Sequence, residues 1–309
     1  MTVPPVDRWY RGNMHTHTTN SDGDAPPVQV VAWYAEHGYD FLSLTDHNVL
    51  TGRLDLPEQL SGVLLMPGEE ITMALDVHVN ALGLSRVIPP PQPPADVAPA
   101  DHRGWLLQQA LAAAAAQGAL AHVNHPNYQW ALDRDILAAI ADVRFFEVFN
   151  GHPLVHNTGD AEHLGTEALW DHLLGLGRRA YGLATDDAHH YQTYSPLYAN
   201  PGRGWVRVGA SALTQAALFE ALEAGRFYAS TGVELAEFDV RGPHVSLCVD
   251  GQPGERYTIE FIGPGGQVVH TEEGVQAQYR LAAGQPYVRG RVSASGGAYA
   301  WLQPQFAVR

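Results

Sequence analysis

The segment "PVQVVAWYAEHGYDFLSLTDHN", residues 27–48, decides the fold. Its first half has apolar residues at helical spacing and closes on Gly38, a residue type common just after helices. Its second half is a short apolar run, typical of a buried strand, that ends in Asp46 and His47. The segment therefore predicts a helix, then a strand, then a polar strand end.

The same unit recurs along the first two thirds of the chain, and we expect an α/β fold. Further helices are predicted in residues 105–118, 134–142, 161–177 and 212–226, and further strands in 62–72, 77–84, 119–127, 143–152, 179–190 and 204–210. The Pro-rich residues 86–99 fit neither pattern and indicate a surface excursion. This alternation predicts parallel strands with helices outside them.

The pattern changes after residues 228–234. Segments such as "HVSLCVDG" and "RYTIEFIGPGGQVVH" alternate at period two, with Gly and Pro between them. We therefore expect two domains, a barrel-sized one in residues 1–230 and a small antiparallel β-module in 231–309.

Composition excludes several classes of protein. The 309 residues include 18 Lys+Arg against 33 Asp+Glu, a net charge of −15, which argues against nucleic acid as a general partner. One cysteine, Cys248, excludes a disulfide framework and a Cys-rich zinc site. The first residues lack the apolar stretch of a signal peptide, and no segment has the apolar length of a membrane span. We expect a cytoplasmic protein of undetermined oligomeric state.

Metal-ligand residue types follow the predicted strands. The segment "NMHTHTTNSDGD", residues 13–24, has two histidines at the two-residue spacing that points strand side chains the same way. Similar residues end the later strands: His47, Glu70, His78, His125, Asp187 and His189. Each alone fits a turn, a surface or a core residue, but the carboxyl ends of parallel strands converge. Together they favour one metal site.

These motifs resemble a known family. "HTHTTNSDG", "LTDHN", "GEEIT" followed by "HVNALGL", "NHP" and "TDDAHH" resemble successive motifs of the polymerase and histidinol phosphatase (PHP) family, over residues 10–190. The longer pattern, with "FFEVFNGH", "GRFYASTG" and the C-terminal module, resembles a PHP branch related to carbaryl hydrolase. The resemblance implies a distorted seven-stranded (βα) barrel with two or three divalent metal ions at the carboxyl ends of its strands.

The resemblance also implies the ligands. Carried over by motif, they are His15, His17, Asp22, His47, Glu70, His78, His125, Asp187 and His189. Because "TDDAHH" doubles both residue types, Asp186 or His190 could replace its neighbour; we favour Asp187 and His189, whose spacing repeats that of the first two histidines. His122 is a rival or supporting residue to His125. The carboxylates expected to orient ligands rather than bind metal are Asp46, Glu69, Glu147 and Asp186.

Nine nitrogen and oxygen ligands exceed the four of one tetrahedral zinc, so two or three ions bridged by Glu70 are expected. Imidazole with carboxylate suits zinc, manganese or iron. Such ions activate water, which predicts a metal-dependent hydrolase. A phosphoesterase acting on small phosphate esters comes first, a carbamate or carboxylic ester hydrolase second, and an inert metal- or ligand-binding protein third.

Other residues complete the predicted site. His122 or His190 is the candidate general acid. Arg203 and Arg226 are candidate phosphate ligands, although Arg226 could instead cap the preceding helix. Asn150 ends a strand and is a candidate substrate contact.

Overall fold

The helices lie where the sequence predicts them. The computed structural model describes residues 8–52 and 54–307. In these residues the α-helices are α1 (Pro27–Glu36), α2 (His102–Ala115), α3 (Arg134–Ala139), α4 (Thr166–Gly175) and α5 (Gln215–Glu223). Short 3-10 turns are η1 (Glu58–Leu60), η2 (Ala74–Asp76), η3 (Pro99–Asp101), η4 (Tyr128–Trp130) and η5 (Pro264–Gly266). The five predicted helices are confirmed, and the Pro-rich residues 86–98 form no helix or strand.

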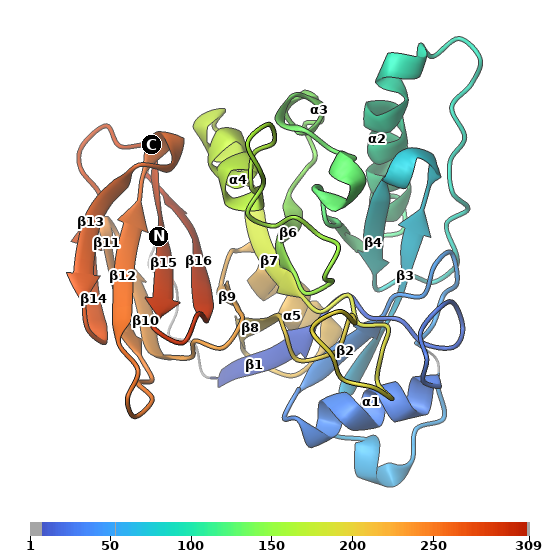
Figure 1. Cartoon of the computed structure of the whole chain (residues 1–309), viewed down its shortest axis with the longest axis horizontal. Helices are drawn as coiled ribbons and strands as arrows, with labels where there is room; N and C mark the ends of the chain where they lie inside the picture. Colours follow the sequence, from blue (N-terminus) through green and yellow to red (C-terminus); the bar gives the residue numbers. More distant parts are fainter. Residues whose placement is uncertain (1–7, 53, 308–309) are drawn as a thin grey trace.

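Most strands belong to one sheet that runs through the molecule (Figure 1). The strands of the first two thirds are β1 (Arg8–Asn13), β2 (Phe41–Leu44), β3 (Leu64–Thr72), β4 (His78–Leu82), β5 (Leu120–Val123), β6 (Phe145–Asn150), β7 (Tyr181–Thr185), β8 (Trp205–Ala210) and β9 (Phe227–Ser230). The remaining strands are β10 (Leu235–Arg241), β11 (His244–Val249), β12 (Tyr257–Ile262), β13 (Val268–Glu273), β14 (Gln276–Arg280), β15 (Tyr287–Ala294) and β16 (Tyr299–Phe306). The large sheet has the order β13-β12-β15-β16-β9-β8-β1-β2-β3-β4-β5-β6-β7.

The expected parallel arrangement is correct for only part of this sheet. β1, β2 and β3 are parallel, and so are β5, β6 and β7. β4 is antiparallel to both of its neighbours. Only residues 73–77 join β3 to β4, which is too short for the crossover that a parallel pair needs. The prediction of a parallel strand here is wrong for that reason.

Helix α5 closes the amino end of the parallel strands. β8 runs antiparallel to β1, and β9 runs back antiparallel to β8, so the predicted parallel strand at 204–210 is also wrong. Leu218 and Leu222 of α5 are fully buried in one core with Phe41, Phe145 and Phe227, the first residues of β2, β6 and β9. Apolar packing therefore fills this end, and the polar strand ends lie at the other.

The described strands form no closed barrel. β7 lies beside β8 and β9 without a ladder to either of them. A side chain bridges part of this seam: the buried Gln303 amide of β16 accepts from Gly182 N at 2.9 Å and donates to Gly182 O at 2.8 Å. The chain is thus a mixed α/β fold with a long mixed sheet, and the seven-stranded barrel is not confirmed.

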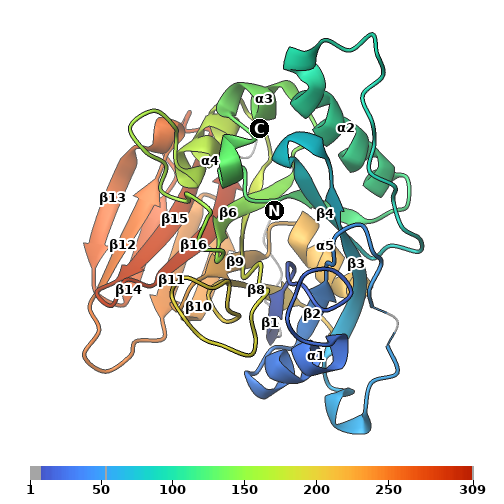
Figure 2. The same cartoon turned by 45° about the vertical axis from the view of Figure 1, so that its right-hand side comes forward.

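The C-terminal strands pack as two layers. β12, β13, β15 and β16 extend the large sheet from β9, while β10, β11 and β14 form a separate antiparallel sheet. Apolar side chains fill the space between these layers, among them Leu247, Ile259 and Phe261. Figure 2 shows this unit to one side of the helices. The division at residue 230 stays a prediction. In the described part of the chain, no helix has the length and apolar character needed to cross a bilayer.

Candidate metal centre

The His-x-His motif lies just beyond β1. Thr16 forms an isolated parallel bridge with Ala188, so the backbone continues in extended form and the two imidazoles point the same way. The ring centroids of His15 and His17 are 5.3 Å apart, and both side chains are fully buried. The two histidines thus face the residues that follow β7.

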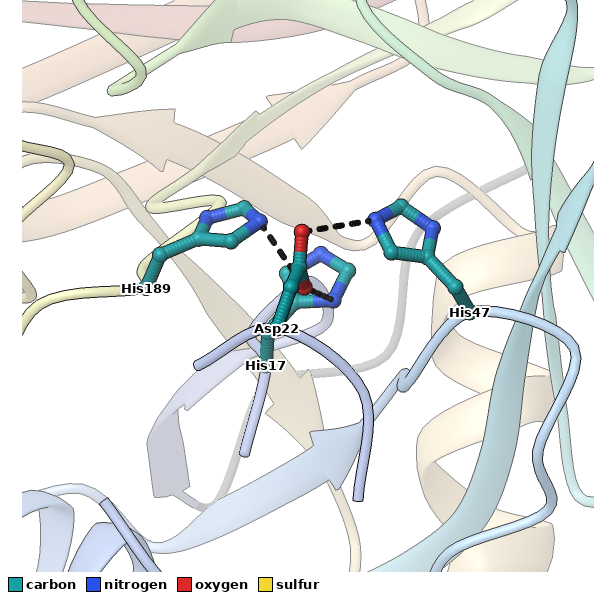
Figure 3. Close-up of side chains that lie close together, drawn as sticks. All are labelled: His17, Asp22, His47 and His189. Atoms are coloured by element: carbon teal, nitrogen blue, oxygen red, sulfur yellow. Dashed lines mark ion pairs between the residues drawn. The ribbon is translucent and has the colours of Figure 1, made fainter. Parts of the chain in front are cut away.

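Asp22 stands at the centre of the first group of candidate ligands, with His17, His47 and His189 around it (Figure 3). Its oxygens lie 3.6 Å from His17 Nδ1, 3.4 Å from His47 Nε2 and 3.4 Å from His189 Nε2. Its turn depends on Gly23, where a Cβ would lie 2.7 Å from the His17 backbone. Because the Asp22 side chain is 53% exposed, the group opens to solvent.

These separations are longer than hydrogen bonds between nitrogen and oxygen, which lie between about 2.7 and 3.2 Å. Two ligands bound about 2.1 Å from the same tetrahedral zinc are about 3.4 Å apart. The two distances from Oδ1, to His17 and His189, therefore match ligands around one ion better than side chains bonded to each other, and His47 lies at a similar distance from Oδ2.

Glu70 belongs to two further groups, which together contain four histidines. It lies with His15 and His17 in one group and with His47 and His78 in another. Its Oε1 lies 3.5 Å from His15 Nε2 and 2.9 Å from His78 Nδ1, and its Oε2 lies 3.4 Å from His17 Nε2. Because its two oxygens face different imidazoles, the carboxylate is placed to bridge two ions.

Asp187 forms the fourth group, with His15 and His125. Its Oδ1 lies 3.1 Å from His15 Nε2, and its Oδ2 lies 4.0 Å from His125 Nε2. Asp187 has φ +49° and His125 has φ +20°. Both residues thus hold a left-handed backbone, uncommon outside glycine, at the ends of β7 and β5.

His78 reaches the site from an unexpected direction. The sequence argument places it at the carboxyl end of a parallel strand, but it is the first residue of β4. Because β4 is antiparallel to β3, its amino end lies beside the carboxyl end of β3, where Thr72 is its partner. His78 therefore lies beside Glu70 and His47 as expected, although the expected direction of its strand is wrong.

The nine predicted ligands all occur in these four groups, within which the ligand atoms lie within 4.8 Å of one another. The donor set is imidazole and carboxylate, which suits zinc, manganese or iron. Two buried atoms, His15 Nε2 and Glu70 Oε2, lie 3.1 Å from Asp187 Oδ1 and 2.9 Å from His47 Nδ1, but neither makes a hydrogen bond of acceptable angle among the described residues. Buried polar atoms of that kind call for another partner, and a cation fits the geometry and the chemistry. That these residues bind metal stays a prediction.

The charges in the site depend strongly on one another. Burial alone would raise the pKa of the Glu70 carboxyl, but the His78 and His15 imidazoles hold it well below its usual range. Burial also opposes ionisation of Asp187, yet His15 and His17 hold its pKa low. Burial disfavours protonation of His47, but Asp22 and Glu70 raise its pKa to about 10. The carboxylates are thus ionised and available to a cation at neutral pH.

Of the predicted supporting carboxylates, Glu147 contacts two candidate ligands and Asp46 contacts residues beside them. Glu147 Oε1 lies 2.6 Å from His15 Nδ1, which leaves Nε2 of that ring facing the ligand groups, and Glu147 Oε2 accepts from His125 N at 2.7 Å. Asp46 accepts from Thr18 N at 2.7 Å and from the Thr51 hydroxyl at 2.7 Å. A carboxylate bonded to a ligand imidazole, as Glu147 is to His15, fixes the direction of that ligand and raises its basicity.

The other two supporting carboxylates face elsewhere. Glu69 alternates with Glu70 along β3 and accepts from Ile88 N at 2.6 Å. Asp186 accepts from the Tyr34 hydroxyl and from three backbone N–H groups, those of residues 202–204, at 2.6–2.9 Å. Its acceptor positions are thus filled, and Asp187 rather than Asp186 enters the groups. His190 stacks on Tyr198 and belongs to no group, whereas His189 does.

Most of the predicted acid and substrate-binding residues are hydrogen-bonded to other residues of the protein or lie away from the candidate ligands. His122 is fully buried beside Met14 O, and burial lowers its pKa to about 4, so it is neutral. Asn150 is buried and donates to Glu147 and Asp187. Arg203 donates to Gly151 O and Ser195 O.

Arg226 lies far from the candidate ligands. It donates to Glu220 at 3.0 Å, next to the start of β9 at the α5 end of the sheet. The structure does not bring this predicted phosphate ligand to the site.

Sequence reasoning missed two site residues. Asn124 Nδ2 donates to Glu70 Oε1 at 2.7 Å, and its position before His125 in "HVNHP" was the available signal. His152 lies beside His189, with ring centroids 5.6 Å apart. His152 ends the segment "FFEVFNGH", but no role is predicted for it, because its place after Gly151 has no metal-ligand spacing.

Comparisons with known proteins show a solved structure that shares the fold of this chain. No family model matches the chain, and no curated protein matches it. Among solved structures, 95% of the chain matches 93% of a two-domain protein from Bacteroides vulgatus that contains a predicted PHP-like metal-dependent phosphoesterase, with 18% identity and a TM-score of 0.53. It also matches 95% of a protein from Bifidobacterium adolescentis, provisionally described as a metal-dependent phosphoesterase, over 68% of this chain, with 15% identity and a TM-score of 0.44. The first likeness shows that the chain shares the fold of the Bacteroides protein.

Proposed function

We propose that the chain is a metal-dependent phosphoesterase of the PHP family that acts on small phosphate esters. The observation that supports this most is the geometry around Asp22, whose oxygens lie 3.4–3.6 Å from three imidazoles. The ligand order along the sequence, and the fold shared with a protein described as containing a PHP-like phosphoesterase, support the same conclusion.

The residues would hold two or three ions. Asp22 with His17, His47 and His189 would hold one, and Glu70 and Asp187 would each contact ions bound by the remaining histidines. When bound, such ions lower the pKa of water and stabilise the oxygens of a phosphoester under attack. Glu147 orients His15 for this task, and the half-exposed Asp22 marks the open side. Zinc, manganese or iron, and a cytoplasmic location, stay predictions from the sequence.

A carbamate or carboxylic ester hydrolase, as in the carbaryl-hydrolase branch, is the second candidate. A specific observation favours it: the chain contains no lysine, and the guanidinium of Arg203 is already bonded to backbone carbonyls. A phosphate is commonly bound by a fork of such donors. An uncharged ester needs no cationic side chain beyond the metal site.

One assay separates the two candidates. The purified protein is loaded with Mn²⁺ or Zn²⁺, its metal content is measured, and it is offered an aryl phosphate, an aryl carbamate and an aryl carboxylic ester. We expect turnover of the phosphate. Turnover of the carbamate or ester alone supports the second candidate, and full metal content with no turnover contradicts both.

A further inference from the structure

His152 lies beside the candidate site without belonging to any ligand group. It follows Gly151, two residues beyond the end of β6, and its side chain is partly exposed. Its ring meets His189 edge-on, with centroids 5.6 Å apart, and Tyr128 edge-on at 6.2 Å. His189 belongs to the group around Asp22, so His152 lies beside that group.

One hydrogen bond fixes the proton on this ring. Leu154 N donates to His152 Nδ1 at 3.2 Å, so Nδ1 is the acceptor and the neutral imidazole has its proton on Nε2. The His152 backbone is held as well, since its N donates to Asn150 Oδ1 at 2.8 Å. Nε2 has no hydrogen-bond partner among residues 8–52 and 54–307. A held donor therefore stands beside the ligand groups.

The site is short of such donors. The guanidinium of Arg203 donates to Gly151 O, Ser195 O and Asn200 Oδ1, and Arg226 lies at the other end of the sheet. The sequence has no lysine. A phosphate group has more oxygens than the metal ions contact, and an N–H donor is the natural partner for the others.

We propose that His152 is a substrate-binding residue whose Nε2–H donates a hydrogen bond to a phosphate oxygen. This inference rests on the proposed function, because it requires a phosphate at the metal site. It replaces the arginine fork expected from the sequence with one neutral donor. A hydrogen bond to a charged oxygen contributes enough to change affinity about tenfold or more.

The test is the binding of inorganic phosphate to the metal-loaded full chain by isothermal titration calorimetry. We expect His152→Phe to weaken binding about tenfold or more at unchanged metal content, and His152→Gln, which restores an N–H donor, to recover part of it. His156→Phe is the matched control, since His156 is an exposed histidine of the same loop that stacks on Trp130, and it should bind phosphate as the wild type does.

Equal phosphate binding by wild type and His152→Phe overturns the proposal, and so does a wild-type protein that holds metal but does not bind phosphate. Failure of His152→Gln to recover any affinity means that the ring packs rather than donates, and this also contradicts it. Turnover of the aryl phosphate by the wild type is scored separately. A protein that binds phosphate through His152 yet hydrolyses no phosphate ester contradicts the proposed function and leaves this inference standing.

Discussion

At the contact between α4 and β15, Arg289 meets Asp171 at 2.6 and 2.8 Å, whereas at the candidate metal centre Asp22 stays 3.4–3.6 Å from three imidazoles. The first cluster is buried and closely paired, since Arg289 also lies 3.0 Å from Glu167 and packs over the Trp170 ring. The second directs carboxylates and imidazole rings towards shared points. Close pairing indicates a structural role, and matched but longer separations indicate a site for a cation.

The largest effect that distinguishes the clusters is expected at Glu70. Glu70→Gln removes the charge that faces several histidines, so we expect loss of metal and a fall in activity of at least about a thousandfold, equivalent to several kcal/mol. Metal content by mass spectrometry and turnover by the aryl phosphate assay measure this. Glu69→Gln is the control, because that neighbour bonds Ile88 N away from the groups. Full metal content in Glu70→Gln would contradict the prediction that the Glu70 carboxylate bridges two ions.

Arg289 should show the opposite behaviour. Arg289→Met leaves Asp171 buried without its charge partner, which costs about 3–5 kcal/mol of unfolding free energy. Because the cluster holds no candidate ligand, the protein that remains folded should keep the wild-type metal content. Chemical denaturation and metal analysis of the same sample test both halves. A loss of metal that exceeds the loss of folded protein would show that the clusters are coupled.

Glu147 is expected to give an intermediate effect, because it bonds a ligand without contacting the ions. Glu147→Gln weakens the hold on His15 Nδ1 and His125 N, and we expect metal affinity to fall about 10–100-fold. Competition with a chelator measures the affinity. Thr166→Val, a change near the α4 start that leaves the ligands untouched, is the control. Unchanged affinity in Glu147→Gln would leave the carboxylate with a packing role alone.

The sequence predicts the ligand groups better than the strand directions. Residue types at motif spacing predict His17, Asp22 and His47 as ligands, and the structure brings these three side chains together. Strand direction depends on connection length, and the short 73–77 link was the one clue that β4 turns back. Nothing local predicts that a side chain, Gln303, bridges the seam beside β7, since its partner Gly182 lies 121 residues away.

Roles outside the ligands were predicted less well, for a physical reason. Asp186 and Glu69 have the same residue types as their neighbours, and only tertiary contacts decide which one faces the site. The same holds for Arg226, whose charge suggests phosphate but whose partner is Glu220. Residue type shows what a side chain is able to bind, and the fold determines whether that side chain lies at the site.

The smallest predicted effect is a pH dependence in the paired cluster. Burial alone would raise the pKa of Glu167, but Arg289 and Arg291 hold it below its usual value. A carboxyl whose folded pKa lies below its unfolded value of about 4.3 stabilises the protein above that pH and ceases to do so as the pH falls through the folded pKa. Glu167→Gln should therefore be less stable than the wild type at pH 7, and the difference should shrink in acid. The test compares the denaturant midpoints of unfolding of the wild type and Glu167→Gln from pH 7 down to the lowest pH at which both proteins fold. A difference that persists unchanged at low pH would assign the effect of Glu167 to packing, and the contrast between a closely paired cluster and a cation-binding one would lose its electrostatic basis.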